Sequence, residues 1–329
     1  MKHSLQHTPL ILSLGLINNA LANPFPSFSP GSGIPTSLLG YTLTWHDEFT
    51  SSASSDSSHL PSSSNWLYDT GTSYPAGAPA WGNNELQTYT TSPSNIALTS
   101  SNTLTITPIY QPAPDSDSET SGTWTSARIE TSRTDFSASP GEKLYIEARL
   151  RTGCAPTSQQ AGIWPAFWAL GAPFREDPTY WPMSSEWDFV EVINGEPTVY
   201  NTLHCGNDAE TGGPCNEYAG LGNGGVSWSG CDWHVVGFEV DRSSSDGGGE
   251  GDGWEEETLR WLIDGVQTLE VSGSDVGDFG VWQSVAHQGH FLLLDVAVGG
   301  NWPGYPDEMT VDGEDVALEV DYVRVWNAD

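Results

Sequence analysis

Short runs of β-branched and aromatic residues, separated by glycine, proline, asparagine and aspartate, recur along most of the chain. Such runs are typical of β-strands joined by turns, and no long stretch has the period of an amphipathic helix. We therefore predict an all-β sandwich or jelly roll. The predicted strands are residues 41–46, 103–110, 124–130, 143–151, 186–194, 198–204, 233–241, 258–263, 291–298 and 316–326.

The first forty residues differ from the rest in composition. Residues 1–22 combine a lysine near the start, an apolar stretch at 10–17 and a small-residue pattern ending at Ala22, which predicts a secretory signal peptide. Residues 23–40 are rich in proline, serine and glycine, so we predict an irregular lead-in segment there. We predict one large domain over residues 41–329. The apolar run is too short to span a bilayer, so we expect a secreted, extracellular protein.

The net charge of the chain limits the classes of partner that we expect it to bind. The chain has 10 basic and 43 acidic residues, giving a formal net charge of −33. Affinity for nucleic acids and for anionic membranes comes mainly from lysine and arginine, so neither partner is expected.

Four cysteines stand at 154, 205, 215 and 231. In an oxidising compartment they predict two disulfides, in any of three pairings. Zinc binding is the alternative, but the chain contains no Cys-x-x-Cys pair.

Residues 243–257 hold six acidic residues and no basic one, which favours a solvated loop between two strands. A calcium site is the alternative reading, although these acids lack the regular spacing of a calcium-binding loop.

The most informative predicted strand carries three acids, Glu186, Asp188 and Glu191. Strict alternation would place Glu186 and Asp188 on one face, and Trp187, Phe189 and Glu191 on the other. One extra residue, a β-bulge between Asp188 and Glu191, would return Glu191 to the face of the other two acids, and bulges are common beside active sites. The sequence then predicts three carboxyl groups lining one groove.

Neighbouring carboxyl groups of this kind suit the cleavage of a glycosidic bond. A retaining mechanism needs a nucleophile and an acid roughly 5–5.5 Å apart, and an inverting one needs about 6.5–9.5 Å. Two close carboxyls cannot both ionise cheaply, so one keeps its proton for donation. The alternative is a row of solvated acids, but it does not explain why large apolar residues occupy the positions between them.

The pattern Glu-x-Asp-x-x-Glu on a strand resembles the signature of glycoside hydrolase family 16, the laminarinase-type β-glucanases. Further segments fit the family's pattern in the same order. They are WHDEF at 45–49, GNNELQTY at 82–89, SARI at 126–129, WPAFW at 164–168, AVGGNWPG at 297–304 and VDYVRV at 320–325.

This resemblance implies a β-jelly roll of two curved antiparallel sheets with a concave substrate cleft. It assigns Glu186 as the nucleophile, Glu191 as the general acid/base and Asp188 as the residue that orients Glu186. The longer spacing before the second glutamate is similar to that of laminarinases, which act on β-1,3-glucans, whereas lichenases usually have Glu-x-Asp-x-Glu. We expect a monomeric endo-β-glucanase acting on β-1,3 or mixed β-1,3/1,4-glucan without a cofactor.

The resemblance also suggests residues that bind the sugar. Trp164 and Trp181 match tryptophans that stack on glucose rings, because an indole covers the apolar face of a pyranose and its N–H can donate. His204 matches a cleft histidine, and the residues that match the donor side of the cleft are Asn83, Glu85 and Arg128. For each of them a purely structural role, in core packing or in turn hydrogen bonds, is the alternative.

Some positions depart from the family's pattern. Trp187 replaces an aliphatic residue and should point away from the cleft, Asp295 stands where asparagine is common, and residues 174–180 lengthen the loop before Trp181. Some family members bind calcium on the convex side, near positions like Glu48 and Asp321, so a metal site is left undecided.

Two other functions remain open. A cell-wall transglycosylase would replace water by a sugar hydroxyl, and a non-catalytic glucan-binding lectin would use the same scaffold without the chemistry. The lectins that resemble this family have lost the catalytic carboxylates, whereas both glutamates are present in this chain. Sulfated galactans are disfavoured as substrates because the net charge of −33 would repel them.

Overall fold

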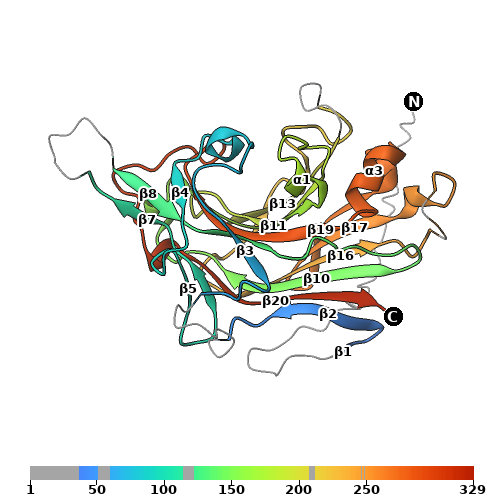
Figure 1. Ribbon diagram of the computed structural model, residues 1–329, viewed down its shortest axis with the longest axis horizontal. Coiled ribbons are helices and arrows are strands. Elements are labelled where there is room, and N and C mark those ends of the chain that lie inside the picture. Colours follow the sequence, from blue (N-terminus) through green and yellow to red (C-terminus); the bar gives the residue numbers. More distant parts are fainter. Residues whose placement is uncertain (1–36, 51–59, 114–121, 207–211, 246, 248) are drawn as a thin grey trace, which may run out of the picture.

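The computed structural model describes residues 37–50, 60–113, 122–206, 212–245, 247 and 249–329. The predicted signal peptide and most of the lead-in, residues 1–36, lie outside the described residues. Two large antiparallel sheets lie one over the other (Figure 1), so the predicted jelly-roll sandwich is confirmed. Among the described residues no helix has the length and apolar character of a membrane span.

The first sheet forms the convex layer and contains both ends of the described chain. Its order is β1-β2-β20-β10-β16-β17-β18, with β6 also paired to β20 and β5 to β6. The strands are β1 (Ser37–Leu38), β2 (Tyr41–Asp47), β5 (Ile96–Leu98), β6 (Leu104–Ile106), β10 (Lys143–Arg151), β16 (His234–Asp241), β17 (Thr258–Ile263), β18 (Val266–Ser272) and β20 (Leu318–Ala328).

The second sheet forms the concave layer. Its order is β14-β13-β12-β11-β19-β9-β3, with β15 also paired to β13. The strands are β3 (Trp66–Asp69), β9 (Arg128–Thr131), β11 (Ile163–Gly171), β12 (Glu186–Glu191), β13 (Thr198–His204), β14 (Leu221–Gly222), β15 (Val226–Ser227) and β19 (His290–Val298). The strand that carries the three acids, β12, is therefore central rather than at an edge.

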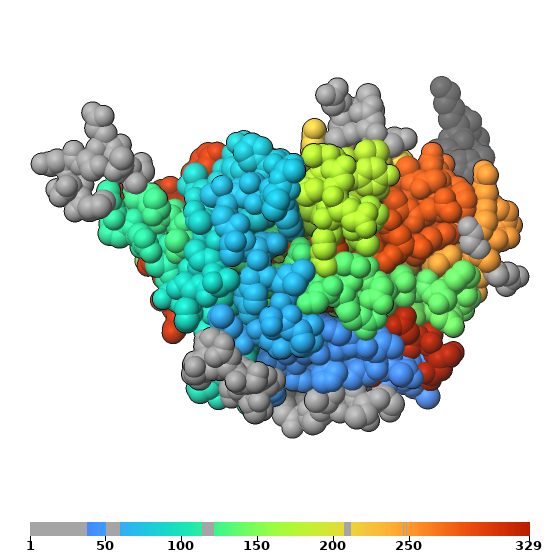
Figure 2. Space-filling model, in the orientation of Figure 1, coloured from blue at the N-terminus to red at the C-terminus, as the bar shows by residue number. Residues whose placement is uncertain are grey.

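A small third sheet and several short helices lie around the two layers. The sheet has the order β4-β8-β7, and its β4–β8 pair is parallel. In Figure 1 the loop with η2 and the loop with α1 both rise above the concave sheet, and they form neighbouring surfaces in Figure 2. These elements are β4 (Gln87–Tyr89), β7 (Ile109–Gln111), β8 (Thr123–Ser126), η2 (Pro79–Gly82), η3 (Thr157–Gln159), η4 (Trp254–Glu256), η5 (Glu314–Val316), α1 (Pro173–Glu176), α2 (Gly273–Val276) and α3 (Phe279–Ala286).

The main core lies between the two layers. Trp187 and Phe189 of β12 point into it, and both rings contact Phe238 of β16, at centroid distances of 4.7 and 4.8 Å. Trp187 therefore points away from the concave face, as predicted. Burying such rings removes a large apolar area from water, and this fixes which face of β12 is left for the acids.

Two of the predicted strands are divided in the structure. Residues 103–110 form β6 and β7, with Pro108 between them, and 124–130 form β8 and β9 on either side of Ala127. Proline lacks the N–H that a ladder needs, which accounts for the first break.

The prediction of a solvated loop at 243–257 is wrong for three of its described residues, Ser245, Trp254 and Glu257, which are buried. The segment does join β16 to β17, but the Glu257 side chain is fully buried. Its carboxylate accepts hydrogen bonds from Arg242, Ser245 and the indole of Trp282. A buried carboxylate is tolerated when its hydrogen-bonding capacity is satisfied in this way.

The four cysteines form two disulfides, Cys154–Cys231 and Cys205–Cys215. The sequence left three pairings open, and the structure selects this one. The second disulfide closes a short loop directly after β13, next to the acids of β12.

Candidate active site

A β-bulge lies in the middle of β12, as predicted. Asp188 and Glu191 pair with Thr202 and Tyr200 of β13, so β12 has one residue more than its neighbour. The ladder with β11 has the same irregularity. The extra residue lets both Phe189 and Val190 point into the core, and Glu191 returns to the concave face.

The bulge frees backbone carbonyls that a regular ladder would use, and both find donors. The indole of Trp261, from the convex sheet, donates to the carbonyl of Asp188 at 2.8 Å. The amide of Asn201 donates to the carbonyl of Phe189, also at 2.8 Å. Because buried carbonyls without partners are costly, these two contacts stabilise the irregular strand.

Strand registers place the polar residues of the concave face in lateral rows. One row runs from Tyr200 through Glu191, Ala166 and Asp295 to Arg128 and Asp69, across six neighbouring strands. A second row pairs His204 with Glu186 and Glu186 with Leu170. Residues opposite one another across a sheet share a face, so these rows define a polar path perpendicular to the strands.

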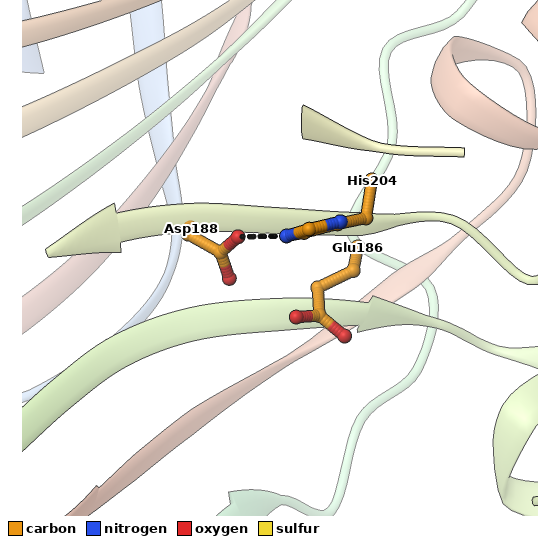
Figure 3. A group of neighbouring side chains, drawn as sticks. All are labelled: Glu186, Asp188 and His204. Atoms are coloured by element: carbon orange, nitrogen blue, oxygen red, sulfur yellow. Dashed lines mark ion pairs between the residues drawn. The ribbon is translucent and has the colours of Figure 1, made fainter. Parts of the chain in front are cut away.

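On the β13 side of β12, a series of contacts surrounds Glu186. The indole N–H of Trp181 donates to Glu186 Oε2 at 2.9 Å. The imidazole of His204 points at the carboxylate of Asp188, with Nε2 3.5 Å from Oδ2, and Glu186 lies alongside (Figure 3). The other ring nitrogen of His204 is 2.8 Å from Glu217 Oε2. We call these residues, Trp181, Glu186, Asp188, His204 and Glu217, the histidine side.

Burial and nearby charges change the pKa values on the histidine side. Burial raises the pKa of Glu186, while His204 and the indole of Trp181 lower it. The pKa of Asp188 is raised well above its usual value by burial and by the charges of Glu191 and Glu186. Burial alone would lower the pKa of His204, but Glu217, Glu186 and Glu191 outweigh it and raise the value to about 9. His204 is therefore a cation at neutral pH.

Glu191 lies beside aromatic side chains as well as charged ones. Burial raises its pKa to about 7, against the lowering effect of His204. The indole of Trp164 lies close enough to lower this pKa as well, although its N–H makes no regular hydrogen bond. The Trp164 ring packs edge-to-face on Trp302 at 5.5 Å, and Trp302 does the same on Tyr200 at 5.0 Å.

On the β11 side of β12, the acids surround one arginine. Arg128 is 5% exposed and donates to Asp69 at 3.0 Å and to the hydroxyl of Tyr74 at 2.6 Å. Its guanidinium also lies over the rings of Tyr74, Trp81 and Trp168. We call Arg128 and the acids around it, Asp69, Glu85 and Asp295, the arginine side.

Of the predicted donor-side residues, Asn83 and Glu85 lie together. Asn83 donates to Glu85 at 3.1 Å, and Gln87 donates to the other carboxylate oxygen at 2.6 Å. Burial and the charge of Asp295 raise the pKa of Glu85 to about 7. Asp295 faces the same side, but its oxygens accept from Tyr89 and Trp168.

Metal binding is not favoured at the positions the sequence indicated. Glu48 forms a two-point ion pair with Arg324 at 2.9 and 2.8 Å, and Asp321 pairs with Arg149. Glu186, Asp188 and His204 present ligand atoms within 4.8 Å of one another. A metal at this group would have to displace the proton that the surrounding carboxylates favour on His204.

Comparisons with known proteins agree with this geometry, although no family model matches the sequence. The crystal structure of an endo-1,3-β-glucanase from Streptomyces sioyaensis is 36% identical with a TM-score of 0.78, covering 90% of this chain and 99% of that one. A β-glucanase of Rhodothermus marinus is 30% identical over 294 residues, which are 87% of this chain and 85% of the relative.

The chain belongs to glycoside hydrolase family 16. Within that family it is a glycosidase of the laminarinase type. Not every relative is named as a glucanase. The clotting factor G alpha subunit of Tachypleus tridentatus is 29% identical, and the matched region is 34% of that protein.

The structure also identifies two residues that the sequence did not indicate. Glu217 contacts His204, and Tyr218 stacks on Trp181 at 5.9 Å with a 15° angle between the rings. Both lie in a loop of cysteine, glycine and proline with no strand pattern. Only the Cys205–Cys215 pairing, which the sequence left open, would have placed them near the acids.

Proposed function

We propose that the protein is a secreted, retaining endo-β-glucanase that hydrolyses β-1,3-glucan. The observation that carries the proposal is the bulge in β12, because it turns Glu186, Asp188 and Glu191 towards one face. The names of the similar proteins from Streptomyces sioyaensis and Rhodothermus marinus support a β-glucan as the substrate. Mixed β-1,3/1,4-glucan is a further expected substrate.

In the first step, the carboxylate of Glu186 attacks the anomeric carbon while Glu191 donates a proton to the departing glycosidic oxygen. The bond to the leaving sugar breaks and a covalent glycosyl-enzyme forms. In the second step, Glu191 takes a proton from water, the water oxygen attacks the anomeric carbon and Glu186 is released.

The electrostatics support these roles. A pKa of about 7 lets Glu191 hold its proton under mildly acidic conditions, as a general acid must. The nucleophile must be ionised, whereas burial raises the pKa of Glu186; the cationic His204 and the N–H of Trp181 act against that rise and favour the carboxylate form. Asp188 shares the concave face with Glu186 and interacts with its carboxyl group, so we assign it to orient Glu186.

The direct test replaces each glutamate by glutamine. Glu191→Gln is expected to lower kcat on laminarin by about 10²- to 10⁴-fold, and Glu186→Gln to remove hydrolysis. Unchanged denaturation curves would exclude unfolding as the cause. NMR of the first product released should show the β-anomer. A Glu186→Gln protein with full activity, or an α-anomer as the first product, would refute the assignment.

A further inference from the structure

The carboxylate of Glu217 is fully buried, yet it is not one of the groups that take part in the proposed reaction. One oxygen is 2.8 Å from His204 Nδ1, and the other accepts from the backbone N–H of Cys205, also at 2.8 Å. Glu217, two positions after Cys215, thus joins the segment that follows the disulfide to the end of β13. We propose that Glu217 is a positioning residue, which holds the imidazole of His204 against Asp188 and so maintains a positive charge beside Glu186.

The strand pairing and the hydrogen bond to Glu217 together fix the orientation of the His204 ring. His204 pairs with Glu186 across the β12–β13 ladder, so its side chain is already on the concave face. A hydrogen bond at Nδ1 then sets the rotation of the ring and leaves Nε2 towards Asp188. A carboxylate that accepts from one nitrogen of a histidine fixes the role of the other, as in many sites where histidine acts.

The contact between Glu217 and His204 also has an electrostatic effect, in addition to its effect on packing. The charged and titratable groups facing His204 are Glu186, Asp188 and Glu191 from β12 and Glu217 from the loop, with Tyr218 beyond Trp181. The hydrogen bond to Glu217 contributes the most towards raising the pKa of His204. His204 in turn contributes the most towards lowering the pKa of Glu186 and of Glu191.

The test uses Glu217→Gln in the full-length protein, because glutamine keeps the shape and an acceptor oxygen but removes the charge. The pKa of His204 is read by NMR, with its signal assigned by loss in His204→Asn. We expect this pKa to fall by about 1 unit or more. The ratio of kcat/KM at pH 8 to that at pH 6 should then fall, because a neutral His204 no longer favours the ionised Glu186.

A double-mutant comparison separates positioning from simple support of the loop. If Glu217 acts through His204, Glu217→Gln added to His204→Asn should change kcat by less than about twofold. Effects that multiply would overturn the proposal. So would an unchanged pKa of His204, or a Glu217→Gln protein whose activity falls by the same factor at every pH.

The chain offers a matched control. Asp264 Oδ2 lies 2.7 Å from His234 Nδ1 at one end of β16, outside the concave sheet. Asp264→Asn should lower the pKa of His234 alone and leave the activity ratio unchanged. The inference rests on the proposed function for its kinetic part only. A wild-type protein inactive on glucan would refute that function, whereas the pKa of His204 would still test the role of Glu217.

Discussion

The concave sheet carries two groups of buried acids, one on each side of the bulge, and they are neutralised in different ways. On the arginine side, Asp69 and Asp295 surround Arg128, whose charge does not depend on pH in the working range. On the histidine side, Glu186, Asp188 and Glu217 surround His204, whose pKa is about 9. The arginine side therefore has a cation of constant charge, which we call the fixed framework. The histidine side has a cation that titrates.

The largest expected effect concerns the arginine side. Arg128→Met leaves Asp69 and Asp295 buried without their cation, which should lower the free energy of unfolding by about 3–5 kcal/mol. Urea denaturation at pH 7 measures it. Arg133→Met is the matched control, because Arg133 pairs with Asp135 at the surface, where an ion pair contributes about 0–1 kcal/mol. Equal losses in the two variants would contradict the idea of a fixed framework.

The histidine side should make stability depend on pH. The pKa of His204 is about 9 in the folded protein and about 6.5 when unfolded, so folding favours the protonated form. Its contribution is complete below about pH 6.5 and is lost as pH rises through 9, a decline of about 3 kcal/mol. Denaturation at pH 6, 7, 8 and 9 should show it, and His204→Asn should remove this part of the decline.

Two acids add a separate decline at lower pH. The pKa values of Glu191 and Glu85 are about 7, above their unfolded values near 4.5, so their protonated forms favour folding and this contribution is lost between about pH 4.5 and 7. A His204→Asn protein that still lost the full amount between pH 7 and 9 would contradict the role given to His204.

The smallest expected effect tests whether the substrate reaches over the histidine side. Tyr218 is 68% exposed and lies parallel to Trp181. If a sugar ring covers this pair, Tyr218→Ala should raise KM for laminarin oligosaccharides by about 2- to 10-fold with little change in kcat. Tyr218→Phe keeps the ring and serves as the control. The same KM in the alanine variant would place the substrate elsewhere.

The sequence predicted the site better than its surroundings. Glu186, Asp188 and Glu191 stand in one short segment, so alternation showed that Glu191 was out of register and that a bulge was needed to bring it to the face of the other two. Strand β11 was not predicted, because Ile163–Gly171 is almost continuously apolar and contains Pro165, so it lacks the alternation of a half-exposed strand. Helix α3, with eight residues, is too short for its period to stand out.

Residues that depend on long-range pairing were the hardest to predict. Glu257 lies in an acidic loop, and its burial depends on Arg242 and Ser245 and on the distant partners Trp282 and His287. The contacts of Arg128 with Asp69 and of Tyr89 with Asp295 likewise join segments far apart in the chain. A local sequence pattern contains no information about such partners, but it does indicate which residues share one face of a strand.

The extra residue in β12 has a consequence for related sequences of different length. Removing Phe189 or Val190 would leave acids at every second position of a regular strand, and an even spacing keeps all three on one side. Inserting one residue at the same place would lengthen the spacing from Asp188 to the second glutamate to four positions, which is also even, so a regular strand would again keep the three acids on one side. The odd spacing in this chain is thus what requires the bulge.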